Sequence, residues 1–221
     1  MSTANLEKTY QLKEQRRHIL ENGDTYVGSV EEDEILGWVL SGKNMIHRKY
    51  KMVPALYKCF DEGLVNCRDH FIRQQGKIEA KTIADVKPVT MIDINVDIND
   101  GIVTLYNDGD GIDVAKHPKH KIYIPEMIFA NLMSSTNYNK DEKKITGGKN
   151  GYGAKLANIF SDKFVVETVD YKRKLKYYQE FYKNMSEKRN AVSTSIRKGF
   201  KSKFKMRCRA CCWLPVPNKN T

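Results

Sequence analysis

One stretch decides the fold: Thr146-Gly-Gly-Lys-Asn-Gly-Tyr-Gly-Ala-Lys-Leu-Ala-Asn-Ile-Phe160 places four glycines within seven residues, directly before an apolar helical pattern. Glycine lets the backbone adopt positive φ angles and bring its N–H groups close to an anion. The residues from Lys155 onward predict a helix whose N-terminal end would face that anion. The spacing matches neither the Walker pattern nor the dinucleotide fingerprint, so a flexible glycine loop before an ordinary helix remains the alternative to a phosphate-binding loop.

The composition indicates a globular protein of one domain, with or without an appendage. A chain of 221 residues with 40% hydrophobic content can bury a substantial core. No apolar run approaches the about 18 to 20 residues that a membrane span requires, and the first residues contain no apolar signal segment. We therefore expect an intracellular protein that has no membrane partner.

The net charge of +11 is concentrated at the C-terminal end of the chain. Residues 183–221 contain 11 Lys and Arg against one acidic residue, which leaves 27 against 26 in residues 1–182. The first 182 residues therefore give no electrostatic indication of nucleic-acid binding. The remainder is interpreted as a basic tail, either the divergent or truncated end of a longer protein or an extension that contacts DNA phosphates.

The five cysteines do not indicate a disulfide framework, because their number is odd and three of them crowd together near the end. Cys208, Cys211 and Cys212 include the CxxC spacing of half a zinc site. No second Cys or His pair follows them, and a structural zinc site needs two such pairs. The sequence therefore does not favour a metal site here.

The most informative helical pattern runs from residue 53 to residue 74. Leu56, Phe60 and Leu64 recur at helical intervals, which predicts a long amphipathic helix. Glu62 and Asn66 are four residues apart and therefore share one face of it. A solvated polar face is the alternative interpretation, but the two residues flank an apolar pair in a core-forming run.

Strict alternation over residues 90–98, a turn at Asn99-Asp100-Gly101 and a second extended run over 102–106 predict a β-hairpin. It ends in the acidic turn Asn107-Asp-Gly-Asp-Gly-Ile112. A calcium-binding loop would need glycine at its sixth position and glutamate at its twelfth, and this register is missing. Weaker patterns predict an N-terminal helix that Asn22-Gly23 ends, a turn at 24–29 leading into an extended segment, a hairpin turn at 41–44, a helix over 126–133, and strands over 164–169 and 175–182.

Three segments together resemble the N, G1 and G2 boxes of the GHKL ATPases, namely Phe60-Asp-Glu-Gly-Leu-Val-Asn66, the acidic turn 107–112, and Gly147-Gly-Lys-Asn-Gly-Tyr-Gly-Ala-Lys155. The closer resemblance is to the ATPase domain of the eukaryotic-type type II DNA topoisomerases, and it covers about residues 8–182. It implies an α/β two-layer sandwich, with helices on one face of a mixed, mainly antiparallel sheet. Residues 1–182 would form the ATPase domain, with an N-terminal strap at about 1–22, and residues 183–221 receive no domain.

The resemblance also implies the site. Glu62 would be the general base that activates the attacking water, Asn66 would bind Mg²⁺, and the Asp108 carboxylate would accept the adenine amino group of ATP. Ribose and phosphate contacts would come from Ser135, Thr136 and Asn137. The triphosphate would be wrapped by Gly148, Lys149, Asn150, Gly151, Tyr152, Gly153, Ala154 and Lys155.

In the full family enzyme, ATP closes a homodimer and drives the passage of duplex DNA, in the nucleus if the source is eukaryotic. The family would continue into a strand with a threonine, for which Thr194 is a weak candidate, and then into transducer and cleavage domains. We therefore expect this chain alone to hydrolyse ATP weakly and not to cleave DNA. His70 stands where the family usually has asparagine, which leaves that contact open. The alternative is a non-catalytic ATP-binding or DNA-binding module that uses the basic tail.

Overall fold

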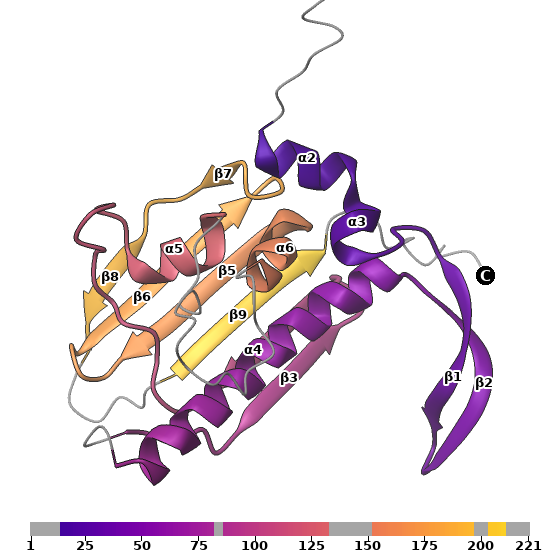
Figure 1. Ribbon diagram of the computed structural model, residues 1–221, viewed down its shortest axis with the longest axis horizontal. Coiled ribbons are helices and arrows are strands. Elements are labelled where there is room, and N and C mark those ends of the chain that lie inside the picture. The colour runs from indigo at the N-terminus through magenta and orange to yellow at the C-terminus, as the bar shows by residue number, and fades with distance from the viewer. Residues whose placement is uncertain (1–13, 82–85, 133–151, 197–202, 211–221) are drawn as a thin grey trace, which may run out of the picture.

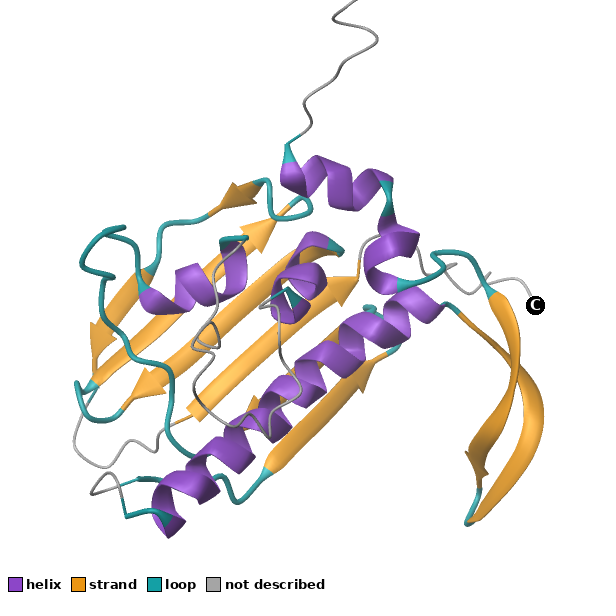
Figure 2. Cartoon of the chain, in the orientation of Figure 1, coloured by secondary structure: helices purple, strands orange, loops and turns teal. Residues whose placement is uncertain are grey.

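The protein has two layers, an antiparallel sheet and a set of helices that cover one face of it (Figure 1). The computed structural model describes residues 14–81, 86–132, 152–196 and 203–210. Figure 2 shows the helices gathered over the same face of the sheet, which confirms the predicted α/β sandwich. Every pairing between the described strands is antiparallel, so the mixed character that we expected does not occur in this part of the chain.

The main sheet has the strand order β3-β4-β9-β5-β6-β7, and β8 also pairs with β6. Its strands are β3 (Ile92–Asp97), β4 (Ile102–Asn107), β5 (Ser161–Asp170), β6 (Leu175–Tyr182), β7 (Glu187–Lys188), β8 (Val192–Ser195) and β9 (Lys203–Ala210). The described helices are α2 (Gln15–Glu21), α3 (Gly23–Val27), α4 (Pro54–Glu79), α5 (Ile124–Ala130) and α6 (Gly153–Ile159).

Helix α4 is the longest element, and it extends the predicted helix by about one turn at its C-terminal end. Pro54 occupies its first turn, where the fixed φ of proline fits and no N–H partner is needed. Cys67 is 1% exposed and packs with Leu105 of β4 and Met206 of β9 in the main core. No helix in the described ranges is both long enough and apolar enough to cross a membrane.

Strand β9 overturns one prediction, because the expected basic tail is not separate from the domain at residues 203–210. These residues form a strand between β4 and β5, in the middle of the sheet. The sequence alternates basic with other residues, as a strand does, and Met206 is buried at 3% exposure. Thr194 lies instead on β8, where it pairs with Lys176 of β6. The interpretation of residues 183–221 as a tail without a domain is therefore corrected for 203–210, because alternating basic residues in a strand resemble a basic tail in the sequence.

The N-terminal helices pack at one end of the helical layer. Ile19 of α2 and Val27 of α3 are buried together with Leu156 and Ile159 of α6. We expected residues 24–29 to form a turn leading into an extended segment. Residues 24–27 instead belong to helix α3. The first part of the predicted strap, residues 1–13, lies outside the described residues.

A second, two-stranded sheet stands apart from the main one (Figure 1, right). It pairs β1 (Asp33–Ser41) with β2 (Asn44–Met52) and confirms the predicted hairpin turn at 41–44. Its exposed apolar side chains include Leu36, Trp38 and Leu40. The nucleotide-site candidates that the structure describes lie elsewhere, on α4, directly after β4, and at the start of α6.

Candidate nucleotide-binding site

Glu62 and Asn66 lie one turn apart on α4, as predicted. The Asn66 side-chain Nδ2 donates to the Glu62 carbonyl oxygen at 2.6 Å, which leaves the Asn66 side-chain oxygen as the end available to a cation. The Glu62 carboxylate is 23% exposed and pairs with Lys58, whose Nζ lies 2.7 Å from Oε1. The hydrogen bond to Glu62 raises the pKa of Lys58 despite partial desolvation.

Helix α6 begins directly against this carboxylate. A Cβ atom placed on Gly153 would lie 1.9 Å from Glu62 Oε2 and 2.7 Å from Glu62 Cδ. A larger residue at this position would therefore require the Glu62 carboxylate to move, so the glycine permits this approach of the side chain to the start of α6. The end of the glycine-rich stretch and the proposed general base are brought together, although they are about 90 residues apart in the sequence.

The other described residues of the glycine-rich stretch pack inward. Lys155 is 2% exposed, and desolvation lowers its pKa to about 8. Ala154 belongs to the main core, and the Tyr152 hydroxyl accepts a hydrogen bond from Gln15 Nε2 at 2.9 Å. The remaining candidates lie outside the described residues, namely Ser135, Thr136, Asn137, Gly148, Lys149, Asn150 and Gly151.

The Asp108 carboxylate is already engaged by the segment that leads into β3. Oδ1 accepts from the backbone N–H groups of Thr90 at 2.7 Å and Met91 at 2.8 Å, and Oδ2 accepts from the Thr90 hydroxyl. Desolvation opposes ionisation, but these hydrogen bonds outweigh it and lower the pKa of Asp108. An ionised carboxylate has about four acceptor sites, so Oδ2 can accept a further hydrogen bond beside that of the Thr90 hydroxyl, and the role of Asp108 in adenine recognition stays a prediction.

The preceding residue, Asn107, is buried at the end of β4. It is 1% exposed and lies on the same side of the strand as the buried Leu105. Its Oδ1 is buried and has no hydrogen-bond partner among the described residues. Asn107 therefore belongs to the interior, and Asp108 follows it at the start of the turn.

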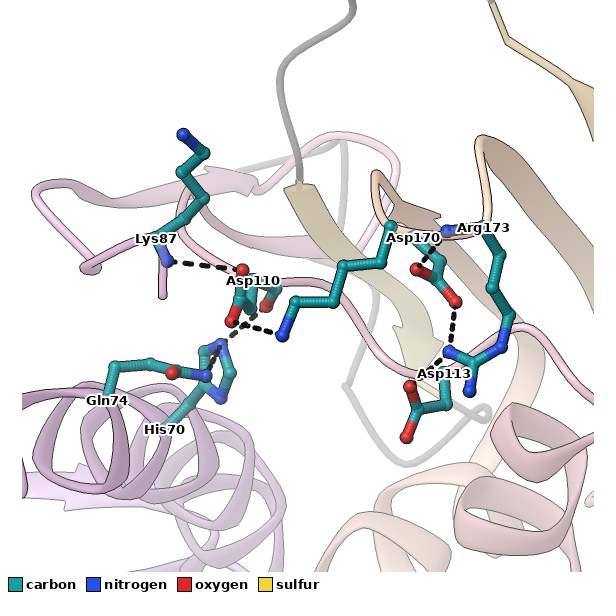
Figure 3. A network of polar contacts seen from close by, with 8 residues as sticks. His70, Gln74, Lys87, Asp110, Asp113, Asp170 and Arg173 are labelled. Atoms are coloured by element: carbon teal, nitrogen blue, oxygen red, sulfur yellow. Dashed lines mark hydrogen bonds and ion pairs between the residues drawn. The ribbon is translucent and has the colours of Figure 1, made fainter. Parts of the chain in front are cut away.

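The acidic turn is hydrogen-bonded to α4 through His70 (Figure 3). His70 Nε2 donates to the Asp110 carbonyl oxygen at 2.6 Å. Histidine therefore forms a contact with the acidic turn at the position where the family usually has asparagine. Burial, and to a smaller extent the charge of Arg73, lowers the pKa of His70. The Asp110 carboxylate accepts from the Lys87 N–H at 3.3 Å.

The acidic turn and the residues directly after it also contact β5 and the residues that follow β5 (Figure 3). Asp170 accepts from the Val114 N–H at 3.0 Å and from the Arg173 guanidinium at 2.8 Å, and Arg173 also binds Asp113. A Cβ atom on Gly111 would lie 2.2 Å from the Val169 carbonyl oxygen. The turn is thus held on both sides.

The acidic side chains of this turn therefore face separate partners. Within the described ranges, no group of three or more His, Cys, Asp or Glu residues could hold a metal ion. Cys211 and Cys212 lie outside the described residues.

Solved structures define the class of this fold and site. The ATPase region of Saccharomyces cerevisiae topoisomerase II aligns with a TM-score of 0.81 at 42% identity, covering 92% of this chain and 51% of that chain. The 43K ATPase domain of Thermus thermophilus gyrase B aligns with a TM-score of 0.58 at 17% identity, covering 89% of this chain and 39% of that chain. The protein therefore has the fold of the GHKL ATPases.

The sequence comparison identifies the family. A protein of Dictyostelium discoideum described as probable DNA topoisomerase 2 is 45% identical over 192 residues, which are 87% of this chain and 12% of that protein. No protein-family model matches the chain. The chain belongs to the family of eukaryotic-type DNA topoisomerase II, whose ATPase region it matches. It spans about 12 to 15% of the length of the curated relatives that it matches first.

Proposed function

We propose that this chain binds ATP with Mg²⁺ between α4, α6 and the acidic turn, and that it hydrolyses the nucleotide. The observation that carries the proposal is the contact of Glu62 with the start of α6, because it places a carboxylate at the end of the glycine-rich stretch. In the proposed mechanism, Glu62 orients the attacking water and accepts its proton. Lys58 holds the carboxylate in place until the water is bound.

The donor set fits Mg²⁺. Because Nδ2 of Asn66 is tied to the Glu62 carbonyl, the amide oxygen is the atom left for a hard cation, which takes oxygen ligands. When bound, Mg²⁺ would neutralise charge on the phosphates. Lys155 would hold a phosphate oxygen by its charge, and the candidates from Ser135 to Asn137 and from Gly148 to Gly151 keep the roles that the resemblance implies.

We assign adenine recognition to Asp108, as the resemblance implies. An ionised carboxylate has about four acceptor sites, and the hydrogen bonds from Thr90 and Met91 use three of them. Oδ2 can therefore accept from the adenine amino group beside the Thr90 hydroxyl, while the hydrogen bonds to Oδ1 hold the carboxylate in place.

In the whole protein, we propose that ATP binding by this region closes a homodimer and drives duplex DNA passage. This activity would take place in the compartment that holds the cell's DNA. The homology with DNA topoisomerase 2 supports this proposal. The alternative of a separate basic DNA-binding tail loses part of its basis, because residues 203–210 belong to the sheet.

Two experiments test the proposal. Calorimetric titration of the 221-residue chain with a non-hydrolysable ATP analogue should show binding that weakens when Mg²⁺ is chelated, and less so in Asn66→Ala. For the whole protein, the chain should restore DNA decatenation when it replaces the matching region of the yeast relative. A chain that binds no nucleotide would contradict the first part, and an inactive chimera that still binds ATP would contradict the second.

A further inference from the structure

The basic end of the chain forms a row of cations along strand β9. Met206 of this strand is buried beneath α4, on the helix side of the sheet. Successive residues of a strand alternate between its two faces, so the basic residues take the register positions of the opposite face. They are Lys203, Lys205, Arg207 and Arg209. Residues two apart in a strand are separated by about 6.6 Å, so the row is about 20 Å long.

The face that carries this row, which we call the open face, has no described helix over it. All of the described helices lie over the other face of the main sheet (Figure 2). Lys205 is partly exposed, and its register partners are Tyr106 of β4 and Glu167 of β5. The row therefore crosses the middle of a sheet face that is accessible in the described part of the chain.

The strands β5 and β6 add cations to the open face beside the row. The Lys163 side chain is 40% exposed, and its Nζ lies 2.9 Å from the Glu180 carboxylate. The Arg189 side chain is 73% exposed, and its guanidinium lies 2.9 Å from the other oxygen of the same carboxylate. The Glu180 side chain itself is 7% exposed. One nearly buried carboxylate therefore holds two cations that remain accessible.

Acidic residues do not cancel this charge. Glu167 pairs with Lys176 at 3.0 Å, so this pair is neutral. Asp93 and Asp97 belong to the same face, but they lie on β3 at the end of the described strand order. The open face is therefore basic over β9, β5 and β6 and acidic along β3.

We infer that the open face over β9, β5 and β6 binds the phosphate backbone of duplex DNA. The inference rests on the proposed function of the whole protein, which brings duplex DNA to this region. Each DNA strand carries one negative charge per about 3.4 Å of helix axis, so a basic row about 20 Å long faces several phosphates. Contacts to phosphates carry no sequence information, so this surface binds without regard to base sequence.

The aromatic side chains of the open face favour duplex over single-stranded DNA. Single strands are bound largely by stacking of their bases on aromatic rings. The Tyr182 ring instead contacts Lys163 and Arg189, whose Nζ and Cζ atoms each lie 5.3 Å from the ring centroid. The hydroxyl groups of Tyr178 and Tyr182 donate to Glu180. These two rings therefore hold the cations in place.

The test measures the affinity of the 221-residue chain for a short DNA duplex at several salt concentrations, by fluorescence anisotropy. The face variant combines Lys205→Gln with Arg207→Gln. The matched control combines Lys43→Gln with Arg48→Gln on the exposed hairpin of β1 and β2, so that both variants lose the same charge. We expect the face variant to bind at least about tenfold more weakly at about 100 mM salt. Its slope of log K against log salt should decrease by about 2 in magnitude. The control should bind within about threefold of the wild type.

Thermal unfolding establishes that each variant is folded. If the face variant does not fold, Lys163→Gln on β5 takes its place, with an expected decrease of about 1 in the slope. Binding of a non-hydrolysable ATP analogue should be the same in the face variant and the wild type, because the candidate nucleotide site lies on the helix side of the sheet.

The outcomes separate this inference from the nucleotide site. A folded face variant that binds duplex DNA as tightly as the control variant overturns the inference and leaves ATP binding untouched. Tighter binding of a single strand than of a duplex of the same length, or equal displacement of the duplex by poly-glutamate of the same charge, also overturns it. A chain that shows the expected loss of DNA binding but binds no ATP analogue supports the DNA surface and overturns the proposed nucleotide site.

Discussion

The carboxylate of Glu62 lies against the backbone of Gly153, so closely that a Cβ atom at residue 153 would be 1.9 Å from Oε2. We therefore expect Gly153→Ala to displace Glu62 and to reduce ATP hydrolysis at least about tenfold, since misplacing a reacting group by about 1 Å costs orders of magnitude. The matched control is Gly76→Ala, near the C-terminal end of α4, where an added Cβ meets nothing within 4 Å. Equal activities of the two variants would contradict the contact.

The buried Lys155 predicts a pH dependence of nucleotide binding. Desolvation lowers its pKa to about 8, so the free protein loses this charge as the pH rises through 8. A bound polyphosphate raises the pKa again, so binding takes up a proton above about pH 8 and weakens as the pH rises. We expect the dissociation constant to increase about tenfold from about pH 7 to about pH 9. In Lys155→Gln this increase should be absent; a variant that retains it would place the titration elsewhere.

Asp108 should contribute to stability. Asp108→Ala leaves two N–H groups without their acceptor, and we expect it to lower the free energy of unfolding by about 1 kcal/mol near neutral pH. Because the folded-state pKa of Asp108 is lowered, its contribution is present above about pH 4 and is lost as the pH falls through the folded-state value. Urea denaturation of the wild type and the variant at about pH 7 and at about pH 3 measures the contribution and its loss.

The same variant should lose most of its preference for adenine nucleotides, because it lacks the carboxylate that accepts the adenine amino group. Competition of ATP with GTP for binding measures the preference. An Asp108→Ala variant that is folded and keeps the full preference would place adenine recognition elsewhere.

The position of β9 predicts that the basic end of the chain stabilises the domain. Met206 is 3% exposed beneath α4, so Met206→Ala should lower the free energy of unfolding by about 2 to 5 kcal/mol. The neighbouring Lys205 is partly exposed, and Lys205→Ala should change the free energy of unfolding by less than about 0.5 kcal/mol. Chemical denaturation of both variants makes the comparison. Equal small effects would mean that β9 is not part of the folded core.

Local patterns were sufficient for most of the fold. Hydrophobic periodicity predicted α4 and both hairpins, and the four-residue spacing placed Glu62 and Asn66 together. Hydrophobic periodicity did not predict strand β9. Charged residues alternate with apolar ones there, and such a run resembles a basic tail unless its pairing with β4 and β5 is known. Strand pairing of this kind is non-local, so no window of the sequence contains it.

The candidate site could be predicted only in part. Glu62, Asn66 and Gly153 follow from sequence motifs. The hydrogen bonds that hold the Asp108 carboxylate do not, because Thr90 and Met91 donate to it from a segment 17 to 18 residues away. The contact of Gly153 with Glu62 is likewise non-local, since about 90 residues separate them in the sequence.

The central claim is that Glu62 activates water for attack on bound ATP. Single-turnover hydrolysis, with protein in excess over ATP, measures this step even when turnover is slow. We predict that Glu62→Gln binds ATP within about threefold of the wild type and hydrolyses it at least about 100-fold more slowly. Hydrolysis by Glu62→Gln at the wild-type rate would contradict the account.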